Sequence, residues 1–131
     1  MNARSNLHPP PPAATPPWRS ALLGASDVFC ISSNYEGTPL TLFEAMASAR
    51  AIVSTSVDGC REVLEEGVSG LLVPPQDPEA LAMALQRVLQ DPTLRQRLAA
   101  GARAASLQYD IARCVERMQD LYDEVLAERA S

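Results

Sequence analysis

Short apolar runs alternate with helical patterns through the middle of the chain. Three runs rich in β-forming residues lie at 28–31, 51–55 and 70–73. Apolar runs of this length are typical of strands buried on both faces of a parallel sheet. Helical patterns over 39–47 and 61–66 separate these strands. Strands that alternate with helices predict parallel βαβ units and an α/β fold.

Helix-start signals recur along the chain. Thr38 precedes Pro39, which predicts Thr38 as an N-cap and Pro39 as the first helical residue. Asp77–Pro78 and Asp91–Pro92 repeat this signal, and Asp110 is expected to cap a last helix. These helices carry apolar stripes made of Leu81, Leu85, Val88 and Leu89, then Leu94, Leu98 and Ala102, then Ile111, Val115, Met118, Tyr122 and Val125. The last helix therefore needs a surface on which to dock.

The first 17 residues differ from the rest because they hold six of the eleven prolines. The run 9–12 favours polyproline II, so we interpret 1–17 as a disordered, Pro-rich leader. A ligand for a proline-recognition domain is the functional alternative. The body, 18–131, begins near Trp18 with a short helix expected over 19–25. Its expected fold is a partial, doubly wound parallel sheet of about three strands with C-terminal helices, which looks like the second half of a Rossmann-like domain.

Composition and charge exclude several functions. The 131 residues allow one domain or part of one, and the net charge of -5 argues against a nucleic-acid binder. The chain has no apolar run as long as a transmembrane helix and no signal-peptide stretch, so we expect a cytoplasmic location. Three widely spaced cysteines and a single histidine suggest neither a zinc site nor a disulfide framework. We expect no metal or cofactor, and Cys30 is interpreted as a small core residue.

The segment after the first strand carries the candidate chemistry. Ligands of open α/β sheets bind outside the carboxyl ends of the strands, so Glu36 in the 33–38 loop is expected at the mouth of a site. The helix that follows offers free backbone N–H groups and a positive dipole end to a phosphate or sugar oxygen. Pro39 has no N–H. The candidate donors are the neighbouring amides of Gly37, Thr38, Leu40 and Thr41.

Glu44 lies eight residues after Glu36, in an otherwise apolar helix. A half-buried carboxylate there needs partners, and two neighbouring hydroxyls such as a ribose diol would satisfy it. The spacing of the two glutamates alone favours a simpler interpretation, in which Glu36 is an ordinary charged loop residue and Glu44 is an exposed helix residue. Tyr35 either stacks on a ligand or is a partly buried aromatic residue of the loop. Arg61 is a candidate for phosphate binding, although a surface salt bridge explains it more simply.

The segment from Asp27 to Ala47 closely resembles the donor site of GT-B glycosyltransferases of family 4, the large retaining family, including their E-x7-E motif. The resemblance continues to the closing helices and covers roughly residues 18–128. It implies that Glu36 lies at the donor sugar and the transferred centre and that Glu44 holds the donor ribose hydroxyls. It also implies a nucleotide-sugar donor, an unidentified acceptor and a leaving diphosphate that helps to deprotonate this acceptor.

The residues before Trp18 do not resemble the segments that precede this region in the family. The family builds its active site between two Rossmann-like domains, and its N-terminal domain carries the acceptor site. We therefore expect a truncated C-terminal part that is inactive alone. A non-catalytic nucleotide-sugar-binding module, an inert remnant of a split gene and a sugar-nucleotide epimerase stay open. In the family the last helix crosses onto the N-terminal domain, so here its apolar face is expected to be exposed and to favour self-association. Peripheral membrane attachment is a further expectation.

Overall fold

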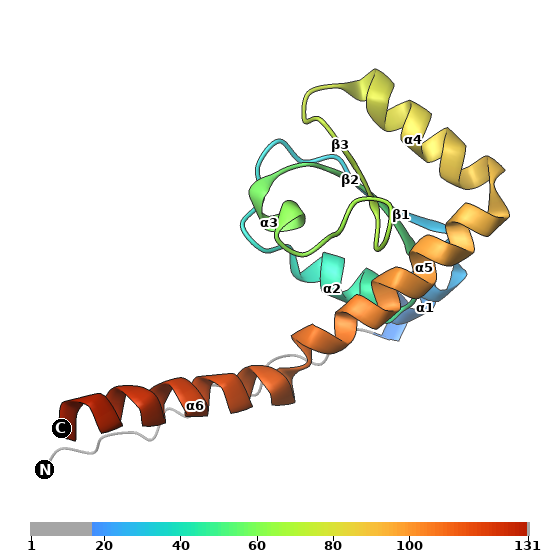
Figure 1. The fold of residues 1–131 in the computed structure, drawn as a ribbon. Helices are drawn as coiled ribbons and strands as arrows, with labels where there is room; N and C mark the ends of the chain where they lie inside the picture. Colours follow the sequence, from blue (N-terminus) through green and yellow to red (C-terminus); the bar gives the residue numbers. More distant parts are fainter. Residues whose placement is uncertain (1–16, 131) are drawn as a thin grey trace, which may run out of the picture.

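The three expected strands form one parallel sheet in which neighbours follow the chain order (Figure 1). They are β1 (Val28–Ile31), β2 (Ala51–Thr55) and β3 (Leu71–Val73). The structure, a computed structural model, describes residues 17–130. The predicted α/β fold with a parallel sheet of three strands is confirmed. The predicted leader lies outside the described residues apart from Pro17, which begins a helix.

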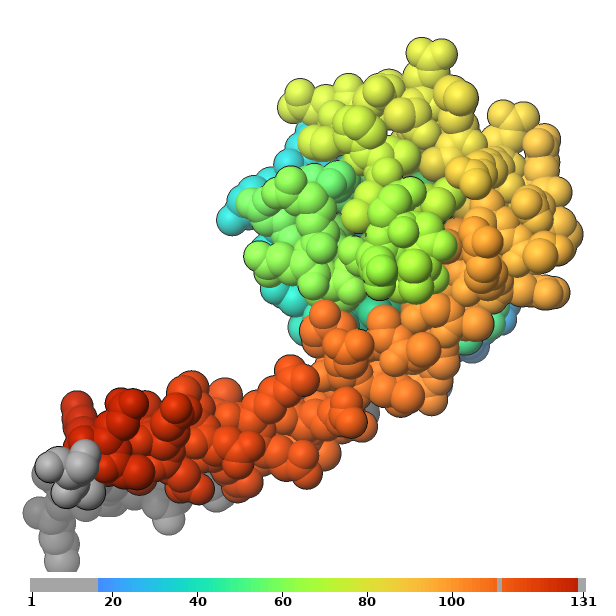
Figure 2. Space-filling view, viewed as in Figure 1, coloured from blue at the N-terminus to red at the C-terminus, as the bar shows by residue number. Residues whose placement is uncertain are grey.

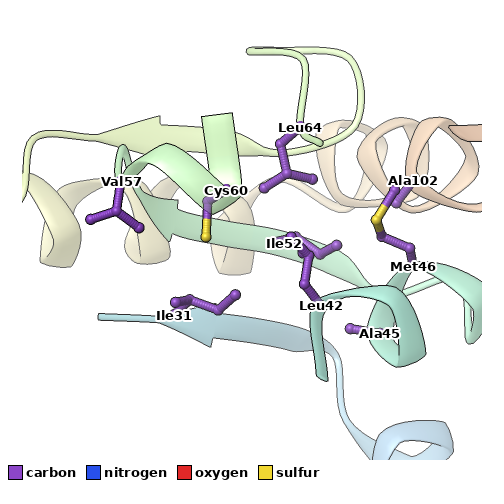
Figure 3. Close-up of a cluster of buried hydrophobic side chains, with 9 residues drawn as sticks. All are labelled: Ile31, Leu42, Ala45, Met46, Ile52, Val57, Cys60, Leu64 and Ala102. Atoms are coloured by element: carbon purple, nitrogen blue, oxygen red, sulfur yellow. The ribbon is translucent and has the colours of Figure 1, made fainter. Parts of the chain in front are cut away.

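Helices cover both faces of the sheet and give it two apolar layers. On one face α2 (Leu40–Ala47) and α3 (Asp58–Arg61) join consecutive strands, and α4 (Pro78–Gln90) packs on the other face. Successive side chains of a strand point to opposite faces, so Ile52 joins the first layer and Val53 the second. Figure 3 shows the first layer, in which side chains from α2 and α3 meet the sheet. Because both faces of β2 are covered, all five of its residues are buried.

The remaining helices are α1 (Pro17–Ala25), α5 (Pro92–Ser106), the 3-10 turn η1 (Leu107–Tyr109) and α6 (Ile111–Ala130). Two predicted N-caps are confirmed. The Oδ1 atoms of Asp77 and Asp91 accept the backbone N–H groups of residues 80 and 94 at 2.9 and 3.0 Å. The apolar stripe predicted for α5 is buried. In the stripe predicted for α4, Leu89 is 54% exposed, so the prediction is wrong at this position.

Three local predictions are wrong. The short helix lies at 58–61 rather than 61–66. Gly59 of this helix is buried and packs against the loop that precedes α2. Pro39 has extended dihedral angles, φ -72 and ψ 115, and is itself the N-cap of α2, so Thr38 does not cap this helix. Cys30 is exposed because β1 lies at one edge of the described sheet, so it is not a core residue.

The last helix extends away from the body (Figures 1 and 2). The Oδ1 atom of Asp110 accepts the N–H of Ala112 at 2.8 Å, in line with the predicted cap. The expected exposure of its apolar face is confirmed for the described positions Val115, Met118, Tyr122 and Val125, and Leu121 and Leu126 of the same helix are exposed as well. The side chain of Ile111 lies outside the described ones, and self-association stays a prediction. No helix within residues 17–130 has both the length and the apolar character needed to span a membrane.

Candidate functional site

A network of hydrogen bonds joins the end of β2 to the loop that follows β1. The Thr55 hydroxyl donates to the backbone carbonyl of Ser33 at 2.6 Å, and Thr55 is only 4% exposed. The Ser33 hydroxyl in turn donates to Oε1 of Glu36 at 2.7 Å. Glu36 is half-buried in the loop at the carboxyl end of β1, which is the predicted position. Two polar side chains therefore stand between the sheet and this carboxylate.

The backbone of the same loop rests on α3. The N–H of Gly59 donates to the carbonyl oxygen of Glu36 at 3.2 Å. A Cβ atom added to Gly59 would lie 1.3 Å from the carbonyl oxygen of Gly37, so no other residue fits this contact without movement of the backbone. The loop is thus held from two sides, by β2 through Thr55 and by α3 through Gly59.

Buried Cys60 lies in α3, within electrostatic reach of Glu36. Burial raises the pKa of the Cys60 thiol above its ordinary value of 9.0, and the negative charge of Glu36 raises this pKa further. A hydrogen bond with Ser54 acts in the opposite direction. The thiol is therefore neutral at physiological pH and belongs to the apolar layer under the loop.

The start of α2 provides the backbone donors. Leu42 donates its N–H to the carbonyl of Pro39 at 3.0 Å, while Leu40 and Thr41 occupy the first two helical positions, whose N–H groups have no acceptor inside a helix. No side chain caps this helix end. Gly37 and Thr38 are exposed in the loop just before it. The predicted donors thus lie in one continuous stretch beside Glu36.

Glu44 lies one turn further along α2 and has a different neighbourhood. Its Oε2 atom is 3.6 Å from Nη2 of Arg19 in α1, and the two side chains are 32% and 37% exposed. Glu44 is therefore half-buried, which agrees with the interpretation of a half-buried carboxylate and not with that of an exposed helix residue. Glu44 and Thr41 line a pocket of about 230 Å³ between α1, β1 and α2, whose other lining residues are Trp18, Arg19, Leu22, Leu23 and Phe29. Glu36 does not line this pocket, so the structure places the two glutamates in separate surroundings.

Other predicted residues have simpler roles. Arg61 forms an ion pair with Asp58 within α3, which agrees with the surface salt bridge expected for it. Tyr35 is 84% exposed, so it is not a partly buried loop aromatic, and its ring is open to a ligand. Within residues 17–130 no group of three or more His, Cys, Asp or Glu side chains has an arrangement suited to a metal ion.

Sequence reasoning missed Ser33, Thr55, Gly59 and Arg19. Thr55 and Ser33 are separated by 22 positions, and Arg19 reaches Glu44 from another helix. No local pattern reports such pairings. The one available signal was the polar Ser–Thr end of an otherwise apolar second strand, which indicates polar partners at the carboxyl edge of the sheet.

Comparison with known proteins adds an independent line of evidence. Residues 19–105 match the family described as "Glycosyl transferases group 1". The chain is 34% identical over 105 residues to the N,N'-diacetylbacillosaminyl-diphospho-undecaprenol alpha-1,3-N-acetylgalactosaminyltransferase of Campylobacter jejuni, covering 80% of this chain and 28% of that protein.

Two solved structures share the fold. The sucrose-phosphate synthase of Thermosynechococcus elongatus superimposes with a TM-score of 0.77 and 31% identity, covering 85% of this chain and 28% of that one. Anabaena HepE, solved in complex with UDP-glucose, gives a TM-score of 0.73 and 25% identity, covering 79% and 29%. The chain therefore spans less than a third of the length of these proteins.

Proposed function

The chain belongs to the family of glycosyl transferases group 1, and from this premise we propose that it forms the donor-binding part of a retaining GT-B glycosyltransferase of family 4. The proposed reaction transfers a sugar, of hexose type, from a nucleotide-sugar donor to an acceptor. The observation that carries the proposal is the strand–loop–helix unit β1–α2. This unit sets Glu36 and a stretch of backbone donors at the carboxyl edge of the sheet.

Each candidate residue has a distinct role in the proposal. Glu36 contacts the donor sugar near the transferred centre. The backbone amides of Gly37, Thr38, Leu40 and Thr41 contact the sugar and the diphosphate, where the dipole of α2 favours negative charge. Catalysis then consists of orienting the donor and stabilising the leaving diphosphate, which helps to deprotonate the acceptor. No metal is required in this scheme.

Glu44 holds the two ribose hydroxyls in this proposal. Its present partner, Arg19, lies 3.6 Å away, and both side chains are about one third exposed. An ion pair of this kind contributes at most about 1 kcal/mol, so a ribose diol can compete for the carboxylate. The pocket beside Glu44, with its apolar walls from α1 and β1, gives the nucleoside a place next to these hydroxyls.

The chain spans 28% of the length of its Campylobacter relative, and the acceptor site is proposed to lie on a separate N-terminal domain. We therefore expect nucleotide-sugar binding, and no sugar transfer, from this chain alone. Detectable sugar transfer by the isolated chain would contradict this expectation. The cytoplasmic location and the peripheral membrane attachment stay predictions.

A thermal melt with added donors tests the proposal. The parent chain, Glu44→Ala and a control, Glu124→Ala, are melted with and without millimolar UDP-, GDP- and ADP-sugars. Glu124 is an exposed residue of α6, the helix that extends away from the body (Figure 1). A ligand that binds only the folded state raises the melting temperature. We expect one nucleotide class to raise the melting temperature in the parent and in Glu124→Ala but not in Glu44→Ala. The absence of a shift with all three classes would contradict donor binding by this chain.

A further inference from the structure

We propose that Ser33 and Thr55 are positioning residues that orient the Glu36 carboxylate toward the donor sugar. The proposal rests on the proposed function, in which Glu36 contacts that sugar. It concerns two side chains that the E-x7-E motif does not include. The two side chains connect Glu36 to the centre of the sheet through successive hydrogen bonds, Thr55 to Ser33 and Ser33 to Glu36.

The first bond starts from the central, fully buried strand. Thr55 ends β2, the central strand, and is 4% exposed. Its hydroxyl donates to the Ser33 carbonyl at 2.6 Å and also lies 3.5 Å from the carbonyl of Ile31. A β-branched side chain on a covered strand has little rotational freedom, so its hydroxyl is a fixed point for the loop. Thr55 therefore sets where the Ser33 backbone lies.

The second bond sets the carboxylate itself. The Ser33 hydroxyl donates to Oε1 of Glu36 at 2.7 Å, and a bond to an ionised acceptor is stronger than a bond between neutral groups. Among the hydrogen bonds of residues 17–130, none engages the second oxygen, Oε2, of Glu36. Holding one oxygen fixes the plane of the carboxylate and leaves the other oxygen for a sugar hydroxyl.

The backbone and the carboxylate of Glu36 have separate supports. The N–H of Gly59 holds the backbone carbonyl at 3.2 Å, while Ser33 holds the side chain. Loss of the Ser33 hydroxyl should therefore leave the loop in place and free only the carboxylate. This separation predicts a selective defect in the recognition of the sugar, with recognition of the nucleotide unchanged.

A spectroscopic measurement on the free chain tests the orientation without any ligand. The carboxyl carbon-13 resonance of Glu36 is assigned by its loss in Glu36→Gln. We expect it to move in Ser33→Ala and in Thr55→Val and to stay near the parent position in Ser33→Thr and Thr55→Ser, which keep the hydroxyls. Ser106→Ala is the matched control, because the Ser106 hydroxyl donates to the Arg103 carbonyl in α5. A resonance that does not move in Ser33→Ala would overturn the proposal.

Calorimetric titrations of the same variants with UDP-glucose and with UDP test the functional consequence. We expect Ser33→Ala to bind UDP-glucose about tenfold more weakly than the parent, with UDP affinity unchanged, because one bond that orients a charged group is lost. Ser33→Thr should restore the affinity for UDP-glucose. Equal weakening for both ligands would overturn the proposal, since it would indicate general damage to the loop.

The two measurements separate the possible failures. A parent chain that binds neither probe contradicts the proposed function for UDP donors, and the role at the donor sugar fails with it. The resonance of Glu36 still decides whether Ser33 orients the carboxylate. If Thr55→Val does not fold, Ser33→Ala and Thr55→Ser carry the test, because Ser33 lies in the loop and Thr55→Ser keeps the donor.

Discussion

Replacing Gly59 by alanine should force apart the two segments that shape the candidate donor site. A Cβ atom at position 59 would lie 1.3 Å from the carbonyl oxygen of Gly37, 2.4 Å from its carbonyl carbon and 3.0 Å from the carbonyl oxygen of Glu36. Non-bonded heavy atoms pack at roughly 3.5 Å, so α3 and the loop must separate by about 2 Å. All three atoms belong to the backbone, and no side-chain rotation relieves the overlap.

The expected loss of stability follows from three contributions. Overpacking in a close contact costs about 1–3 kcal/mol. Separation also breaks the hydrogen bond from the Gly59 N–H to Glu36, whose loss costs about 1 kcal/mol. Alanine returns up to about 1 kcal/mol through its higher helix propensity. The free energy of unfolding should therefore fall by about 2 kcal/mol, which lowers the Tm of a domain of this size by roughly 10 °C.

The assay is thermal unfolding followed by circular dichroism, with Gly24→Ala as the control. Gly24 lies in α1, and no heavy atom lies within 4 Å of a Cβ atom built there. The same change of residue should therefore leave the Tm of Gly24→Ala unchanged or raise it slightly. If Gly59→Ala melts together with the parent, the contact between α3 and the loop is not as close as described. The support proposed for Glu36 would then be incorrect.

Three further changes test other parts of the structure. Arg50→Ala removes side-chain bonds to the carbonyls of Ser48, Gly24 and Ser26, which join the ends of α1 and α2, and a urea titration should show a loss of about 1–2 kcal/mol. Asp91→Ala removes the N-cap of α5 and should lower stability by about 1 kcal/mol in the same titration. Because burial and Glu36 place the folded-state pKa of Cys60 above 9.0, its neutral thiol supports folding below that pH, and this support is lost as pH rises through the folded-state pKa. The urea midpoint of the parent should fall above pH 9 more than that of Cys60→Ala.

Local signals predicted the elements whose ends depend on their own residues. Asp77 and Asp91 cap the helices that their Asp–Pro dipeptides indicate, and the apolar run 51–55 is the buried central strand. Each of these features is decided by neighbouring residues. The parallel direction of the strands also followed from the alternation of strands and helices.

Contacts between distant segments decided the rest. The position of α3 depends on the fit of Gly59 against Gly37, and the exposure of Cys30 depends on the place of β1 at the sheet edge. In the site, the sequence predicted the position of the 33–38 loop, and it left open whether Glu44 is half-buried or exposed. It did not predict that Thr55 and Ser33 hold Glu36, or that Arg19 approaches Glu44, because nothing near these residues encodes their partners.

The pairing of strands in chain order has a consequence for biosynthesis. β1 can pair with β2, and β2 with β3, as each strand leaves the ribosome, since no strand waits for a later one. Both apolar layers nevertheless need α5, which supplies Ala102 to one layer and Leu98 to the other. A nascent chain that stops before α5 leaves both apolar layers incomplete, because α2, α3 and α4 cover only part of the two faces of β2. Until α5 has been synthesised, apolar side chains of both layers therefore stay open to contact with other chains.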